Sequence, residues 1–246
     1  VLNTLSSKRK PCLLISGGID SNIIYSIAKL NQIGLTTLST IFDTKEESAN
    51  ADALIARKNV DKSNHIELNI NFSTYLDLIE TSPSKLHEPK YNKNQEMYNY
   101  VFGHMAKNNI KLALTGDGAD ELFSGYKMHL LNYFFNFKKF FKYENLKYLI
   151  ELLGKKKFLK MFFKSDVYDV FNATYSNYEV DDKILSDLKK LLCQYSINNK
   201  DEYSNFTILE LYTIVLEDFL MTKDNFGMAY SIEARFPFLN SFRKHA

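Results

Sequence analysis

The chain has 246 residues, of which 45% are hydrophobic, which is enough for one large domain with a buried core. Glycine (9) and proline (4) are scarce, so the composition excludes a disordered or fibrous protein. A formal net charge of +2 gives no field that would mark a nucleic-acid or membrane binder, and residues 1–10 contain no apolar run typical of a signal peptide or anchor. With only two cysteines, Cys12 and Cys193, we expect no disulfide framework and predict a cytoplasmic protein.

The first predicted unit is a strand, a tight loop and a helix. Residues 12–15 are a short apolar run typical of a buried strand, and apolar residues from 23 to 30 then recur at helical spacing. Further strands are predicted at 36–42, 65–70 and 111–115, with helical patterns at 53–55, 74–80 and about 95–108. Strands that alternate with helices predict an α/β fold: a parallel sheet flanked by helices, with ligands bound at the carboxyl ends of the strands.

The pattern changes after residue 126. Strand signals fade, and segments rich in Phe, Leu, Tyr and Lys predict helices to the end of the chain. We therefore predict an α/β core over residues 1–126 and a helical part of the same domain over 127–246. Between 127 and 164 lysines alternate with aromatic residues, a mixture that binds single-stranded nucleic acid in some proteins. We favour amphipathic helices with buried aromatic rings and outward lysines, and expect no nucleic-acid partner.

The loop after the first predicted strand, SGGIDS at 16–21, is suited to binding phosphate. Gly17 and Gly18 let backbone N–H groups approach an anion, and the helix start behind them favours negative charge. Ser16 and Ser21 add hydroxyl donors. Asp20 would repel a phosphate unless a divalent cation bridged the two, so it predicts Mg²⁺. The alternative is a glycine turn in which Asp20 caps the helix.

This hexapeptide lacks the lysine of the G-x-x-x-x-G-K-S/T loop. It resembles the pyrophosphate-binding loop of the ATP pyrophosphatases, a superfamily that includes asparagine synthetase, β-lactam synthetase, GMP and NAD synthetases and tRNA thiolases. The resemblance implies an adenine nucleotide α-hydrolase-like fold and the splitting of ATP into AMP and pyrophosphate. It makes residues 1–126 the nucleotide-binding core, with adenine expected near Leu14 and Phe42.

A second loop, TGDGADELFSGY at 115–126, follows the last strand predicted in the core. Asp117, Asp120 and Glu121 place three carboxylates within five residues, which repel one another unless a metal, a cation or hydrogen bonds compensate. In isolation a solvated acidic turn would explain them. Beside a phosphate loop, they predict carboxylates that hold Mg²⁺.

The run GDGADELFSGY resembles the signature of asparagine synthetases and their close relatives. The resemblance implies Asp20 and Asp120 as Mg²⁺ ligands and places Gly116 beside the nucleotide. It also implies that Asp117 lies near the substrate and the acyl-adenylate, where it would guide or deprotonate the incoming amine.

A third segment, KDNFGMAYSIEARFPFLN at 223–240, is similar to the same family with departures. Asn225 stands where the family has arginine, Gly227 where it has serine, and Asn240 where it has aspartate. The loss of a cation near the pyrophosphate leaves Lys223 as the candidate to replace it. Within this segment, we expect Glu233 and Arg235 to form a structural pair and Pro237 to end a helix.

The resemblance implies a ligase that activates a carboxylate, first of all aspartate, as acyl-AMP and joins it to ammonia or another amine. In the family a lysine beyond the Pro-Phe-Leu segment supports amide formation, and Lys244 is the candidate, with an ordinary solvated lysine as the alternative. Glutamine-dependent members carry an amino-terminal glutaminase domain that begins with a nucleophilic cysteine. We expect Cys12 to be a buried strand residue, so glutamine use would need such a domain upstream of Val1. A β-lactam or peptide-cyclising relative, or a nucleotide-binding module without turnover, is the alternative.

Overall fold

A computed structural model describes residues 1–5, 7, 9–44, 47–86, 94–126, 129, 190, 207, 210–211 and 220–240. The chain forms two compact units, one made of Val1–Ala119 with Leu216–Ala246 and the other of Asp120–Val215. Among the helices that the structure describes, none has the length and apolar character to cross a bilayer.

The first unit is built on a five-stranded sheet in the order β3-β2-β1-β4-β5, with every neighbouring pair parallel. Strands β2 and β3 are added on one side of β1, whereas β4 and β5 are added on its other side. The direction in which successive strands are added to the sheet therefore reverses between β1 and β4. Such a switch point is where open α/β sheets bind ligands. The predicted parallel sheet flanked by helices is therefore confirmed, with strands β1 (Cys12–Leu14), β2 (Thr36–Phe42), β3 (His65–Ile70), β4 (Leu112–Leu114) and β5 (Glu233–Arg235).

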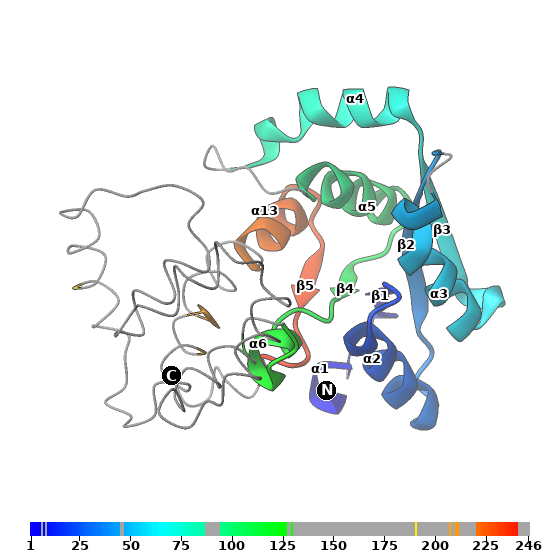
Figure 1. The fold of residues 1–246 in the computed structure, drawn as a ribbon, viewed down its shortest axis with the longest axis vertical. Helices are drawn as coiled ribbons and strands as arrows, with labels where there is room; N and C mark the ends of the chain where they lie inside the picture. Colours follow the sequence, from blue (N-terminus) through cyan, green and yellow to red (C-terminus); the bar gives the residue numbers. More distant parts are fainter. Residues whose placement is uncertain are drawn as a thin grey trace, which may run out of the picture. The chain divides into compact units, whose positions relative to one another are not determined.

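Helices cover both faces of this sheet (Figure 1). The alternation of side chains along β1 and β4 divides their residues between two hydrophobic cores. Leu13 and Leu114 face a core shared with α1, α2 and α3, whereas Cys12 and Ala113 face a core shared with α5 and α13. The helices are α1 (Leu2–Leu5), α2 (Ile19–Leu30), α3 (Ala51–Asn59), α4 (Phe72–Thr81), α5 (Gln95–Lys107), α6 (Ala119–Phe123) and α13 (Met221–Ala229), with the 3₁₀ turns η1 (Glu47–Asn50), η2 (Lys62–Asn64) and η3 (Pro83–Lys85).

The fifth strand corrects the expectation of helices up to the end of the chain. Helix α13 ends at Ala229, and the chain turns through Ser231, whose φ is 56°, into β5 beside β4. The expectation that Pro237 ends a helix is therefore wrong. A three-residue strand carries too little alternation to be recognised in a sequence, and its backbone pairing with β4 overrides the helical pattern around it.

Cys12 is fully buried in β1, as expected for a small apolar core residue. Burial raises the pKa of its thiol to about 12, which keeps it protonated at neutral pH.

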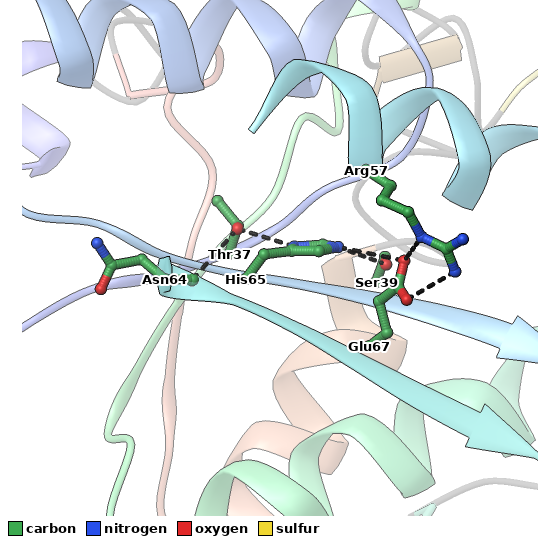
Figure 2. Close-up of polar contacts among 6 residues, drawn as sticks. All are labelled: Thr37, Ser39, Arg57, Asn64, His65 and Glu67. Atoms are coloured by element: carbon green, nitrogen blue, oxygen red, sulfur yellow. Dashed lines mark hydrogen bonds and ion pairs between the residues drawn. The ribbon is translucent and has the colours of Figure 1, made fainter. Parts of the chain in front are cut away.

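A polar cluster lies on the β2–β3 side of the sheet, beneath α3 (Figure 2). The ring of His65 lies between two hydroxyl groups, with Nδ1 2.9 Å from Thr37 Oγ1 and Nε2 3.2 Å from Ser39 Oγ. Next to it, the guanidinium of Arg57 on α3 donates two hydrogen bonds, of 2.7 and 2.8 Å, to the carboxylate of Glu67. This cluster ties α3 to the edge of the sheet with every charged partner paired.

Candidate functional site

The first loop connects β1 to α2 over four residues, as predicted. Gly18 is the N-cap of α2, with an extended backbone (φ −67°, ψ 153°), and Ile19 begins the helix. The N–H groups of the first helical turn have no carbonyl partner within the helix, and the helix dipole adds positive potential there. The loop therefore has the backbone geometry of an anion site.

The two serines of this loop hydrogen-bond within the loop. The Ser21 hydroxyl is buried; it donates to the Ser16 carbonyl at 3.1 Å and accepts from the Ser16 N–H at 3.2 Å. The Ser16 hydroxyl accepts from the Gly18 N–H at 3.2 Å. Ser21 therefore braces the loop from inside, while Ser16 is exposed and better placed to reach a ligand.

The start of the second loop lies directly against the first. Strands β1 and β4 are parallel neighbours in which Leu13 pairs with Leu114, so both loops leave the sheet at the same edge. The two backbones then come so close that a Cβ atom on Gly116 would lie 3.1 Å from the Ser21 nitrogen and 3.2 Å from the Asp20 Cβ. The start of the acidic loop thus lies beside the first loop, as expected for loops that follow neighbouring parallel strands, and the glycine at 116 is what permits the contact.

Asp117 is paired with a buried lysine. Its Oδ2 atom lies 2.9 Å from the Nζ atom of Lys223 and accepts a hydrogen bond of 2.5 Å from Thr115. The side chain of Lys223 is 3% exposed, and its ammonium group lies 4.5 Å from the ring centroid of Tyr98. Burial alone would lower the pKa of Lys223, but the Asp117 carboxylate and Tyr98 outweigh it and raise that pKa above its ordinary value. Lys223 is therefore protonated at neutral pH.

This pairing could not be read from the sequence. From its position two residues before Asn225, Lys223 is expected near the pyrophosphate. In the structure Lys223, on α13, contacts Asp117. A lysine within the apolar pattern of a helix was the available signal that its ammonium group is buried and needs a counter-ion.

Asp120 and Glu121 begin the second unit. A Cβ atom on Gly125 would collide with the Asp120 carboxylate, so the glycine near the end of the acidic run makes room for this side chain. Glu121 is buried and accepts a hydrogen bond of 3.0 Å from the Tyr126 hydroxyl. Burial raises the pKa of Glu121, against the hydrogen bond from Tyr126, which lowers it.

Two further residues of the second unit were not singled out from the sequence. The imidazole of His129 is in very close contact with the carboxylate of Glu210, and both side chains are buried. The His129 Nδ1 atom accepts from the Tyr126 N–H at 3.3 Å. Across the residues that the structure describes, no group of three or more His, Cys, Asp or Glu side chains is arranged to hold a metal ion. A joint Mg²⁺ site on Asp20 and Asp120 stays a prediction.

The two residues expected near adenine lie at strand ends. Leu14 ends β1 and Phe42 ends β2, and both are half-buried. The backbone of Phe42 is already used, because its N–H donates to the Asn50 side chain at 2.7 Å and its carbonyl accepts from that side chain at 2.8 Å. An adenine contact at Phe42 would therefore involve the side chain rather than the backbone.

The third segment adds a structural pair. Arg235 Nε lies 2.8 Å from Glu233 Oε1, so the expected pair is confirmed, and Arg235 also donates to the Thr4 carbonyl at 2.9 Å. The arginine thereby ties β5 to α1. Lys244 lies outside the described residues.

Residues 1–241 match the family model for asparagine synthase. The chain belongs to the asparagine synthase family. It is 29% identical over 115 residues to proteins of Mycobacterium bovis and of two Mycobacterium tuberculosis strains, whose names assign them provisionally as glutamine-hydrolysing asparagine synthetases. The matched part is 47% of this chain and 17% of each relative, so the chain spans about a sixth of the length of the curated relatives it matches.

A solved structure of a U34-tRNA thiolase from Methanococcus maripaludis aligns with 99% of this chain. The alignment covers 75% of the thiolase chain, with 12% sequence identity and a TM-score of 0.34. At that score the likeness supports no conclusion about this member of the asparagine synthase family.

One departure from the family pattern has a structural reason. A Cβ atom on Gly227 would lie 2.7 Å from the Ile232 carbonyl oxygen, because the turn after α13 folds back on the helix at this point. In this member of the asparagine synthase family the serine usual at that position would need the turn to shift. Nothing in the structure explains Asn225.

Proposed function

We propose that this chain is the adenylating part of an amide-forming ligase. It binds ATP, activates a carboxylate as acyl-AMP with release of pyrophosphate, and transfers an amine to the acyl group. Aspartate is the first acid to test. The observation that carries the proposal is the contact of Gly116 with Asp20 and Ser21, because it joins the phosphate-type loop and the acidic loop at one edge of the sheet.

The residues of the first loop suit the triphosphate. The N–H groups at the start of α2 and the Ser16 hydroxyl supply fixed donors for pyrophosphate oxygens, and such donors stabilise charge that develops on a leaving group. The carboxylates of Asp20 and Asp120 are hard oxygen donors of the kind that Mg²⁺ prefers. When bound, Mg²⁺ would supply neutralisation of phosphate charge.

The residues of the second loop suit the acyl group and the amine. Asp117 lies one residue after the contact between the two loops, and we assign it to the amide-forming step, where its carboxylate orients the amine. Lys244 is proposed as the lysine that supports the same step. The amine is free ammonia, another amine, or ammonia from a glutaminase domain upstream of Val1.

The partners and the location of the protein are proposed as well. The partners are small molecules, with neither membrane nor nucleic acid among them. A cytoplasmic location is supported by Cys12, which is a free, buried thiol.

The proposal is tested by product analysis with the full chain. Wild-type protein is incubated with ATP, Mg²⁺ and aspartate, with and without ammonia, and pyrophosphate and AMP are measured. We expect pyrophosphate release that depends on the acid, and loss of it in Asp20→Asn. If aspartate and ammonia together elicit no AMP, the assignment to free asparagine is wrong, and a panel of other carboxylic acids then decides whether a β-lactam-type or peptide-cyclising relative remains.

A second candidate is a nucleotide-binding module without turnover. The specific observation in its favour is Asn225, which leaves the third segment without the family's arginine, while the nearest lysine is committed to Asp117. Binding of ATP by calorimetry, combined with no pyrophosphate release for any acid tested, would establish this candidate in place of the ligase.

A further inference from the structure

The most unusual charged group of the first unit is the ammonium of Lys223. The Lys223 side chain is 3% exposed, and its ammonium group lies 2.9 Å from Asp117 Oδ2 and 4.5 Å from the centre of the Tyr98 ring. A buried ammonium is strongly destabilising when unpaired, whereas a carboxylate and an aromatic face in contact with it compensate for the lost water. The Lys223–Asp117 pair is therefore an integral part of the folded structure and not an incidental surface contact.

We propose that Lys223 is a positioning residue that acts through Asp117, and that its ammonium group does not bind the pyrophosphate. The inference rests on the role proposed above for Asp117 in amide formation. It replaces the expectation from the sequence that Lys223 substitutes for the arginine missing at 225.

The directions of two neighbouring residues support this assignment. Gly116 is turned toward Asp20 and Ser21 of the phosphate-type loop, because a Cβ atom there would meet both of them. The next side chain, Asp117, is turned toward α13 and meets Lys223. Two consecutive positions of the second loop therefore face different neighbours, the phosphate-type loop at Gly116 and Lys223 of α13 at Asp117.

The two oxygen atoms of Asp117 have different surroundings. Lys223 and Thr115 both bind Oδ2, and within the described part of the chain Oδ1 has no hydrogen-bond partner. The Asp117 side chain is 21% exposed. Lys223 therefore fixes the carboxylate so that one oxygen is held inside and the other is left for a ligand.

The charge of the pair defines the ligand that Oδ1 suits. Because Lys223 already neutralises the carboxylate, a second cation gains little there, whereas an N–H donor gains a full hydrogen bond. A neutral amine is such a donor, and it is also the form with the electron pair that attacks an acyl carbon. The geometry assigns Oδ1 of Asp117 as the acceptor that orients a neutral amine.

The test uses the full chain with Lys223→Met, Asp117→Asn, the double variant, and Lys85→Met as the matched control. Lys85 also lies over a tyrosine ring, that of Tyr230 at 4.9 Å, but away from the two loops. We expect the double variant, which removes both charges of the pair, to bind MgATP within about threefold of wild type, because a neutralised pair exerts little field beyond its own contact. We expect kcat/KM for the amine to fall by about 100-fold in Lys223→Met, as for other misplaced catalytic groups. Asp117→Asn should show a similar loss, and the double variant no further loss.

Three outcomes would overturn the inference. A loss of MgATP or pyrophosphate affinity of more than about tenfold in the double variant, with Asp117→Asn unaffected, would make Lys223 a phosphate ligand. Unchanged amine kinetics in Lys223→Met, or losses that multiply in the double variant, would remove the link through Asp117. If Lys223→Met does not fold, the double variant carries the binding measurement, since it buries no unpaired charge. Wild-type protein that releases no pyrophosphate defeats the proposed function instead, and the MgATP titration of the variants then still decides whether Lys223 binds phosphate.

Discussion

Gly118 offers the sharpest test of how the acidic loop is held in place. Its φ of 84° lies in the left-handed region, and an added Cβ atom would collide with Leu239, at 2.5 Å from Cγ and 2.9 Å from Cδ1. Alanine at this φ costs about 1–2 kcal/mol, and overpacking against a buried leucine adds about 1–3 kcal/mol. We therefore expect Gly118→Ala to reduce the free energy of unfolding by about 2–5 kcal/mol, a large part of a typical total of about 5–15 kcal/mol.

Urea denaturation of four variants separates the two contributions. Gly34→Ala is the matched control, because a Cβ atom there meets nothing within 4 Å, and it should be unchanged or up to about 1 kcal/mol more stable. Leu239→Ala alone should cost about 2–5 kcal/mol as a buried leucine. In Gly118→Ala/Leu239→Ala the collision is gone, so the double variant should be more stable than the sum of the two losses by about 1–3 kcal/mol.

Two results would refute this reasoning. If the two losses add within about 0.5 kcal/mol, the second loop is not pressed against Leu239. If Gly118→Ala is as stable as Gly34→Ala, the left-handed conformation at 118 is absent in solution.

Four further predictions concern ionisation and charge. The Arg57 guanidinium lowers the pKa of Glu67 in the folded protein. The stability from this pair is therefore present above the pKa of Glu67 in the unfolded chain, about 4.3, and is lost as the pH falls through the lower pKa of the folded state. Glu67→Gln should remove this acid-dependent part of the free energy of unfolding. Burial lowers the pKa of His65, so the folded state loses stability as the pH falls below about 6.5, and His65→Asn should flatten that slope between pH 6.5 and 5. Cys12, with its pKa raised to about 12, should resist alkylation at pH 8 in the native protein and react in denaturant, and native labelling would contradict its burial. Asn225→Arg should lower the dissociation constant for pyrophosphate by up to about tenfold if residue 225 faces the leaving group, and an unchanged constant would contradict that placement.

The sequence predicted the parts of the site that depend on local chemistry. The loop at 16–21 and the acidic loop at 115–126 carry their glycines and carboxylates in continuous runs, and parallel neighbouring strands bring such runs to the same edge. Strand β5 was missed because Glu233–Arg235 is too short for periodicity and forms only by pairing with β4.

Contacts between distant segments were also beyond the sequence. Lys223 and Asp117 meet because α13 shares a hydrophobic core with β4, the strand that precedes the second loop, and nothing local to either residue shows it. The same is true of His129 and Glu210 in the second unit. In both cases the need of a buried charge or polar group for a partner is general, but the identity of the partner is decided by tertiary structure.

The central claim is that the loop at 16–21 and the start of the acidic loop at 115–119 form one binding site for ATP with Mg²⁺. Calorimetric titration of the full chain with ATP, with and without Mg²⁺, tests it in wild type, Asp20→Asn and Gly116→Val. We predict one ATP bound per chain in the presence of Mg²⁺, loss of the Mg²⁺ dependence in Asp20→Asn, and binding at least about tenfold weaker in Gly116→Val, whose side chain would push into Asp20 and Ser21. Absence of binding by wild type, or binding that neither variant changes, would contradict the shared site.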